Sequence, residues 1–120
     1  MQIRLLKSKL HRVTVTKTLI DYDGSITIDR DLMDAAGIYP YEQVLVANLA
    51  NGTRHETYVV TGDRGSGAIE ILGAAAHLVN KGDKVIIMAY ADIEKDRVCE
   101  HKPKVVLVDD QNRIRKIKPD

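Results

Sequence analysis

The pair Gly24-Ser25, within the segment Tyr22-Asp23-Gly24-Ser25, has the residue types needed to cut its own backbone. The serine Oγ lies close along the chain to the preceding carbonyl carbon and could attack it as a nucleophile. Glycine favours this attack, because it accepts a strained backbone and leaves its carbonyl unshielded. The simpler interpretation of the same residues is a hairpin turn. Self-cleavage is therefore a hypothesis that needs support from the rest of the chain.

A second group of polar residues, Arg54 to Tyr58, follows the dipeptide Asn51-Gly52. On a strand, alternation would place Arg54, Glu56 and Tyr58 on one face. The guanidinium of Arg54 suits a carboxylate, and the hydroxyl of Tyr58 could deliver a proton to a reacting atom. A solvated strand edge would show the same pattern, so this group alone does not establish a site.

The run Gly73-Ala74-Ala75-Ala76 allows two interpretations. Small residues often mark a close packing contact. They could also open a helix whose first N–H groups bind an anion, with little side chain in the way. Arg64, next to Gly65, could be a turn residue or a second contact for an anion. His77 is expected to pack or to support other groups, and Cys99 has no evident role.

The spacing of apolar residues shows what must position these groups. Apolar residues recur mostly with period two, which indicates a mainly β chain. Three continuous apolar runs predict strands buried on both faces: residues 44–47, 85–88 and 105–108. Asn51-Gly52 predicts a tight hairpin turn, because both residues can take a positive φ. Short strands separated by such turn signals are typical of a β-barrel or a sandwich.

Two short helices interrupt the strand pattern. Asp29 or Asp31 can cap a helix that ends at Gly37, with three apolar residues on one face: Leu32, Ala35 and Ala36. Residues 73–79 can form the second helix. The basic residues from Arg113 onward are expected to be exposed or frayed, because chain ends are usually loose.

The composition predicts one domain spanning residues 1–120. Its 18 basic and 17 acidic side chains give a net charge of +1, so no global field favours nucleic acid or anionic lipid. The single cysteine cannot form an internal disulfide, and no Cys/His cluster suggests a metal. No signal peptide or apolar run of about 20 residues is visible, which favours a cytoplasmic protein without a membrane span.

Taken together, these motifs resemble the aspartate 1-decarboxylase family. Each motif is weak alone, but their order and spacing are specific, and the resemblance fades after about Asp96. The matching residues are Lys9-Leu10-His11-Arg12, Val15-Thr16, Tyr22, Gly24-Ser25, Leu32, Asp34-Ala35-Ala36-Gly37-Ile38, Asn51-Gly52, Arg54, Thr57-Tyr58, Arg64-Gly65-Ser66, Gly73-Ala74-Ala75-Ala76-His77 and Gly82-Asp83.

The resemblance implies a double-psi β-barrel with short helices, assembled as a homotetramer with active sites between subunits. It implies autocatalytic cleavage at Gly24-Ser25, through an ester, into residues 1–24 and 25–120. Ser25 would become a covalent pyruvoyl group, which takes up electrons as pyridoxal phosphate does in other decarboxylases. The reaction would convert L-aspartate to β-alanine and CO₂, supplying pantothenate and coenzyme A biosynthesis.

The resemblance also implies a role for each site residue. Ser25 and Tyr58 would be catalytic, with Tyr58 as the proton donor, and Arg54 would hold a substrate carboxylate. Thr57 would bind substrate and assist cleavage. The backbone of Gly73, Ala74 and Ala75 would also line the substrate site. Three residues would support it: Lys9, His11 and Tyr22.

One residue departs from the family pattern, since Leu72 stands where asparagine is frequent. This removes an amide near the reacting group. Two alternatives remain open from the sequence: a non-catalytic barrel that binds DNA or protein, and a pyruvoyl decarboxylase for another amino acid such as glutamate. A helper protein that triggers cleavage is a further possible partner.

Overall fold

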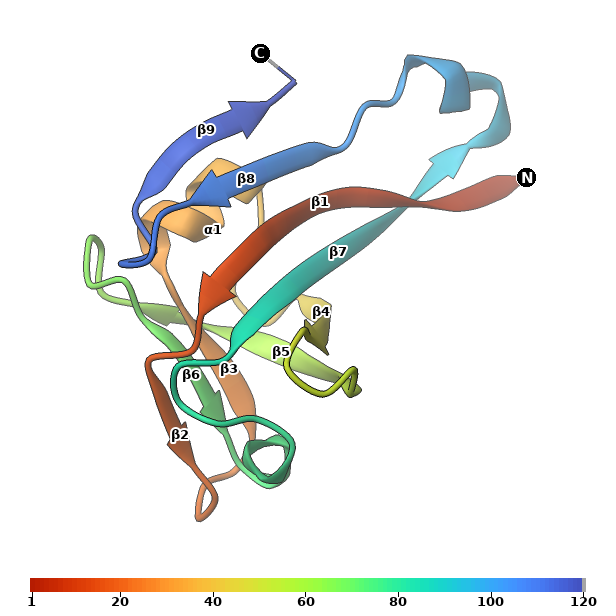
Figure 1. The fold of residues 1–120 in the computed structure, drawn as a ribbon. Coiled ribbons are helices and arrows are strands. Elements are labelled where there is room, and N and C mark those ends of the chain that lie inside the picture. Colours follow the sequence, from red (N-terminus) through yellow and green to blue (C-terminus); the bar gives the residue numbers. More distant parts are fainter. Residues whose placement is uncertain (120) are drawn as a thin grey trace.

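The computed structural model describes residues 1–119, and strands dominate it (Figure 1). The strands are β1 (Gln2–Thr14), β2 (Lys17–Leu19), β3 (Ser25–Asp29), β4 (Gln43–Asn48), β5 (Arg54–Gly62), β6 (Ile69–Leu72), β7 (Lys84–Glu94), β8 (Lys104–Val108) and β9 (Ile114–Lys118). The helices are α1 (Arg30–Ala36) and two 3₁₀ segments, η1 (Ala74–His77) and η2 (Lys95–Glu100).

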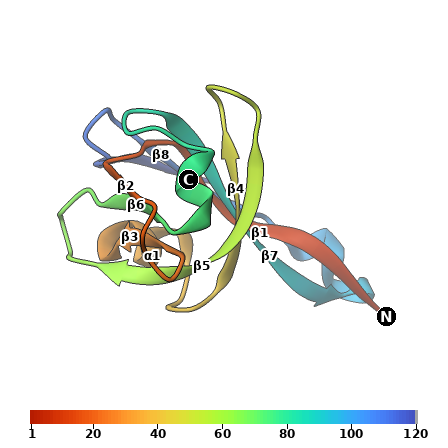
Figure 2. The same ribbon diagram turned by 90° about the horizontal axis from the view of Figure 1, so that it is seen from below.

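The strands form one mixed sheet in the order β2-β6-β3-β5-β4-β7-β1-β8-β9. Strand β2 lies at one edge of this order and β1 lies near the other edge. Only Val15 and Thr16 separate the two strands in the chain, so this short link holds the two parts of the sheet together. The Thr16 N–H donates to the Ile69 carbonyl at 2.8 Å, and the Val15 N–H donates to the Asp83 carbonyl at 2.9 Å. These bonds draw the sheet around on itself, as Figure 2 shows from below. The predicted mainly β, barrel-like fold with short helices is confirmed.

A long two-stranded ribbon extends from the barrel. Strands β1 and β7 pair antiparallel from Gln2 with Glu94 to Thr14 with Lys84. The outer part of this ribbon projects away from the other strands and carries the N-terminus and η2 at its tip (Figures 1 and 2). The barrel end of the ribbon contributes Leu10, Val13 and Val85 to the core, all fully buried.

The apolar runs are less buried than their sequence predicts. In β4, Val44 and Val46 are buried, whereas Leu45 and Ala47 are only half-buried. Alternation is the same in β7, and Val106 alone is fully buried in β8. The prediction of burial on both faces is therefore wrong for this chain, because each strand turns one face to the barrel core and the other outward.

Local capping rules explain helix α1. The Asp29 carboxylate accepts the Asp31 N–H at 2.8 Å, and Gly37 adopts the left-handed conformation with φ of 68° that ends the helix. Of the two predicted caps, Asp29 is the one used. The buried face carries Leu32, Met33 and Ala36, while Ala35 is only partly buried.

Three other local predictions need correction. The second helix is shorter than residues 73–79, being one 3₁₀ segment of four residues. Residues Ile114–Lys118 form strand β9, which is exposed as predicted but is paired with β8 rather than frayed. The hairpin at Asn51-Gly52 joins β4 to β5, yet only Gly52 has a positive φ, 75°. Asn51 instead accepts the Thr53 N–H through its side chain, which stabilises a longer loop.

Candidate active site

Ser25 is the first residue of β3, and two strands flank it. On one side it pairs with Leu72 at the end of β6. On the other side β3 runs parallel to β5, with Ile26 opposite Val59. Because the strands are parallel, the residues one position earlier, Ser25 and Tyr58, also lie side by side. Strand register thus places two separate sequence motifs, Gly24-Ser25 and Thr57-Tyr58, at one point of the barrel.

The backbone at the suspected cleavage point is strained. Gly24 has φ of 103° and Ser25 has φ of 133°, a region that residues with a Cβ rarely adopt. Ser25 is 2% exposed, and its Oγ has no hydrogen-bond partner among residues 1–119. A buried hydroxyl without a partner costs free energy, and such groups call for a functional explanation. A nucleophile held ready for attack is one such explanation.

The Tyr58 hydroxyl contacts the peptide bond that would be cut. It donates to the Gly24 carbonyl oxygen at 3.2 Å. Tyr58 is 39% exposed and lies on the outward face of β5 with Arg54 and Glu56, as strand alternation predicts. Thr57 is half-buried and lies on the opposite, core-directed face with Val59.

Gly73 packs directly against Gly24. A Cβ built on Gly73 would lie 2.6 Å from the Gly24 Cα and 2.7 Å from its nitrogen, so only glycine fits without a shift. Its N–H is already used, since it donates to the Leu19 carbonyl at 2.8 Å. The packing interpretation therefore holds for Gly73. Since η1 is a single short 3₁₀ segment, it gives little support for an anion site based on a helix N-terminus.

Arg54 is exposed and unpaired. Within residues 1–119, no hydrogen bond or ion pair engages its guanidinium. Its neighbour Glu56 instead accepts a hydrogen bond from Gln43 at 2.7 Å. Four residues of a strand span about 13 Å, so Arg54 begins some way along β5 from Tyr58. Its long side chain is free to turn toward a ligand.

Lys9 and His11 lie on β1, which β5, β4 and β7 separate from β3 in the sheet order. In the described part of the chain, neither residue makes a hydrogen bond or ion pair with the Gly24-Ser25 turn. Burial lowers the pKa of His11, and the nearby charges of Lys9 and Arg12 lower it further. Tyr22 does lie near the turn, since its carbonyl oxygen is 3.1 Å from the position of a Cβ on Gly73.

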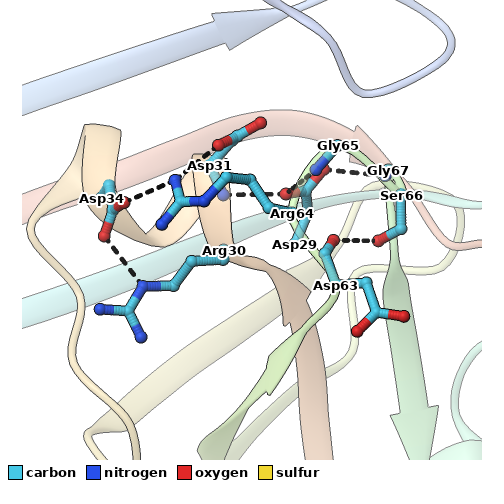
Figure 3. Close-up of polar contacts among 9 residues, drawn as sticks. All are labelled: Asp29, Arg30, Asp31, Asp34, Asp63, Arg64, Gly65, Ser66 and Gly67. Atoms are coloured by element: carbon cyan, nitrogen blue, oxygen red, sulfur yellow. Dashed lines mark hydrogen bonds and ion pairs between the residues drawn. The ribbon is translucent and has the colours of Figure 1, made fainter.

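Arg64 belongs to a separate structural cluster, shown in Figure 3. Its guanidinium pairs with Asp31 at 2.7 Å and with Asp34 at 2.9 Å, both on α1. These hydrogen bonds raise the pKa of Arg64 and, with those from Arg30, lower the pKa of Asp34. Both carboxylates accept from the same nitrogen, Nη1, and their negative charges disfavour a substrate anion beside this guanidinium. Arg64 is therefore a residue that ties the β5–β6 turn to α1.

The environment of Tyr58 includes a residue that the sequence did not single out. The ring of Tyr41 lies beside the ring of Tyr58, with centroids 6.4 Å apart and planes tilted by 31°. The signal available in the sequence was Pro40-Tyr41, a turn dipeptide shortly before β4. Strand pairing, which local patterns do not reveal, brings that turn next to β5.

Among residues 1–119, no group of three or more His, Cys, Asp or Glu side chains could hold a metal ion. In the same range, no helix is long and apolar enough to cross a membrane.

Comparison with known proteins assigns the family. The family model described as aspartate decarboxylase matches residues 1–115. The chain belongs to the aspartate decarboxylase family. It is 56% identical over 114 residues to an aspartate 1-decarboxylase of Caldicellulosiruptor bescii, covering 95% of this chain and 89% of that protein. It is 54% identical over 117 residues to one of Leptospira biflexa, covering 97% and 99% respectively.

The family match extends further than the motifs indicated. It runs to residue 115, past Asp96, where the sequence resemblance was expected to fade. The matched region therefore includes β8 and the start of β9. Strand β8 pairs with β1, and β9 pairs with β8, so the match reaches strands at the far edge of the sheet.

Proposed function

We propose that this aspartate decarboxylase cuts itself between Gly24 and Ser25, converts Ser25 into a pyruvoyl group, and then decarboxylates L-aspartate to β-alanine and CO₂. The product would supply pantothenate and coenzyme A biosynthesis. The observation that carries the proposal is the Tyr58 hydroxyl on the Gly24 carbonyl oxygen, beside a buried Ser25 Oγ that has no partner.

The first bonds made and broken in cleavage belong to Gly24 and Ser25. The Ser25 Oγ attacks the Gly24 carbonyl carbon, the peptide C–N bond breaks, and an ester joins the two residues while Ser25 gains a free amine. Elimination then releases the Gly24 carboxylate and leaves a dehydroalanine. One water molecule hydrolyses its imine form, which releases ammonia and leaves the pyruvoyl ketone. The φ of 133° at Ser25 is strained and raises the energy of the uncut turn, whereas Gly24 adopts its positive φ without strain.

The position of Ser25 fits the group that would replace it. A pyruvoyl group there would supply an electrophilic carbonyl that takes up the electron pair left by the departing CO₂. Gly73 packs directly against Gly24, with no space for a larger side chain between them. The hydroxyl of Tyr58 also contacts Gly24, at its carbonyl oxygen. No side chain among residues 1–119 hydrogen-bonds the Ser25 Oγ, so none must be displaced for its conversion.

The substrate would be held and protonated by residues around this turn. Arg54, which has no partner among residues 1–119, would bind one carboxylate of aspartate through its two-donor fork. Thr57 and the backbone of Ala74 and Ala75 would line the rest of the site. Tyr58 would deliver a proton to the α carbon after CO₂ leaves, since its hydroxyl already lies at the Gly24-Ser25 junction.

We further propose that residues 1–120 form one domain and that four copies assemble with active sites between them. Lys9 and His11 would then support the site of a neighbouring copy, because β1 is remote from β3 in the sheet order. Exposed apolar residues near the turn support such an interface: Leu19, Ile20 and Tyr22. A cytoplasmic location and a helper protein for cleavage complete the proposal.

Replacing the nucleophile tests the proposal. Ser25→Ala should leave a folded chain that stays uncut and inactive, because alanine removes only the attacking oxygen. The change should alter stability by no more than about 1 kcal/mol, since the lost hydroxyl had no partner. Mass spectrometry of the wild type should show residues 1–24 and 25–120, the latter without a free amino group. β-Alanine formed by the variant, or a wild type that stays uncut while active, would refute the proposal.

A further inference from the structure

Tyr41 combines an exposed ring with a strained backbone. Its φ is 68°, in the left-handed region that a bulky side chain disfavours. The residue is 78% exposed, so burial of its ring does not offset that strain within this chain. Strain of this kind persists where surrounding structure imposes it, and it gathers at functional sites.

A turn that precedes β4 imposes the strain. The Glu42 N–H donates to the Tyr39 carbonyl at 3.1 Å, with Pro40 and Tyr41 at the two central positions. Proline followed by a residue of positive φ is the pattern of a type II turn, which usually has glycine or asparagine at the second position. The turn is attached to β5, because the Tyr41 N–H donates to the Val59 carbonyl at 2.7 Å.

This attachment places the Tyr41 ring against Tyr58, the residue that precedes Val59. The ring centroids are 6.4 Å apart, within the range of favourable aromatic pairs. The hydroxyl of the same Tyr58 reaches the Gly24 carbonyl oxygen. A glycine or asparagine in the turn would remove both the strain and this ring contact.

We propose that Tyr41 is a positioning residue for the reaction. Its ring restricts the Tyr58 ring to the orientation in which the hydroxyl points at the Gly24-Ser25 junction. The function of residue 41 is the ring contact with Tyr58, and this function requires an aromatic residue despite the strained backbone. This inference rests on the proposed role of Tyr58 as proton donor.

Four variants separate the ring from the strain. Tyr41→Asn removes the ring and relieves the strain, whereas Tyr41→Ala removes the ring and keeps the strain. Both should lower kcat per cleaved chain by roughly 2- to 10-fold, the worth of an aromatic pair, with little change in KM. Only Tyr41→Asn should also raise Tm. Tyr41→Phe should restore kcat, and Tyr39→Asn, in the same turn but without contact to Tyr58, should leave it unchanged.

A double variant identifies the route of the effect. If Tyr41 acts through Tyr58, adding Tyr41→Asn to Tyr58→Phe should not lower the residual kcat further. An undiminished kcat in Tyr41→Asn, beside a strongly impaired Tyr58→Phe, would overturn the positioning role alone. A lower Tm for Tyr41→Asn would overturn it too, by giving the ring a structural role. Wild-type turnover by Tyr58→Phe would instead overturn the proposed proton donor.

Discussion

At the scale of single residues, Tyr58 contacts the peptide bond to be cut and is also the proposed proton donor in turnover. Its hydroxyl makes one neutral hydrogen bond, of 3.2 Å, to the Gly24 carbonyl oxygen. Such a bond contributes about 0.5–1.5 kcal/mol, which corresponds to roughly 2- to 10-fold in a rate. A positioned acid in the decarboxylation contributes more, typically about 10²–10⁴-fold. Loss of the phenol should therefore slow self-cleavage only slightly but slow decarboxylation strongly.

Tyr58→Phe should cut itself nearly as the wild type does, at most roughly 10-fold more slowly. Its turnover of aspartate should fall by about 10²–10⁴-fold, because phenylalanine cannot donate a proton. Fragment ratios by mass spectrometry and β-alanine formation by the cut protein measure the two effects. A variant that never cuts would show that the phenol is needed for cleavage, whereas full turnover would shift the donor role to Lys9 or a water molecule.

Arg54→Lys should lower kcat/KM for aspartate severely, because lysine keeps the charge but loses the planar fork. A loss of about 1.5–3 kcal/mol, or roughly 10- to 150-fold, is expected for a charge-assisted hydrogen bond. Arg64→Lys is the matched control, since Arg64 is exposed and already held by Asp31 and Asp34. Equal kinetics for both variants would make Arg54 a solvated surface residue.

At the scale of secondary structure elements, Asp29, the last residue of β3, joins that strand to two other segments. Its carboxylate accepts the N–H groups of Asp31, Gly65 and Gly67, at 2.8, 3.0 and 2.8 Å (Figure 3). Asp29 is 3% exposed, so these are buried or half-buried bonds. Through them, one residue caps α1 and fixes the turn between β5 and β6, the two strands that flank Ser25.

Asp29→Ala should destabilise the protein by about 2–4 kcal/mol, because it removes a helix cap and leaves the Gly67 N–H buried without a partner. Asp29→Asn should cost less, since its amide oxygen can still cap the helix. Chemical denaturation of both variants in the uncut Ser25→Ala background measures the difference. A loss below about 1 kcal/mol for Asp29→Ala would show that water replaces these bonds.

At the scale of the whole molecule, half-buried histidines link stability to pH. Burial lowers the pKa of His55, whose Nε2 has no partner among the described residues, and also lowers that of His11. The unfolded chain therefore binds protons at a higher pH than the folded chain. The free energy of unfolding that these two histidines contribute is fully present above the ordinary histidine pKa of 6.5. It is lost as the pH drops below that value.

We expect the Tm of the uncut Ser25→Ala protein to fall between about pH 8 and about pH 5.5. His55→Gln in the same background should reduce that fall, because the unfolded chain then gains one proton fewer on acidification. Calorimetry at the two pH values measures both. An unchanged fall in the His55→Gln variant would assign the acid sensitivity to other groups, with His11 as the next residue to replace.

Much of this protein could be predicted from the sequence alone, where local chemistry decides. The period-two pattern, the Asp29 cap and the Gly37 end of α1 depend on residues a few positions apart. Local sequence patterns therefore predict the strands and the helix. The Gly24-Ser25 pair, together with the order of the other motifs, was enough to indicate the family.

Only the tertiary structure decided which of these pieces meet. The parallel pairing of β3 with β5 brings Tyr58 to Ser25, and β6 brings Gly73 onto Gly24. The same packing directs Arg64 to α1, away from a substrate, and places Tyr41 against Tyr58. Strand partners some thirty residues apart are selected by burial of the whole barrel core. No local pattern contains that information. Arg54 and Arg64 therefore look equally suited to an anion in the sequence, but only Arg64 is held by carboxylates of α1 in the structure.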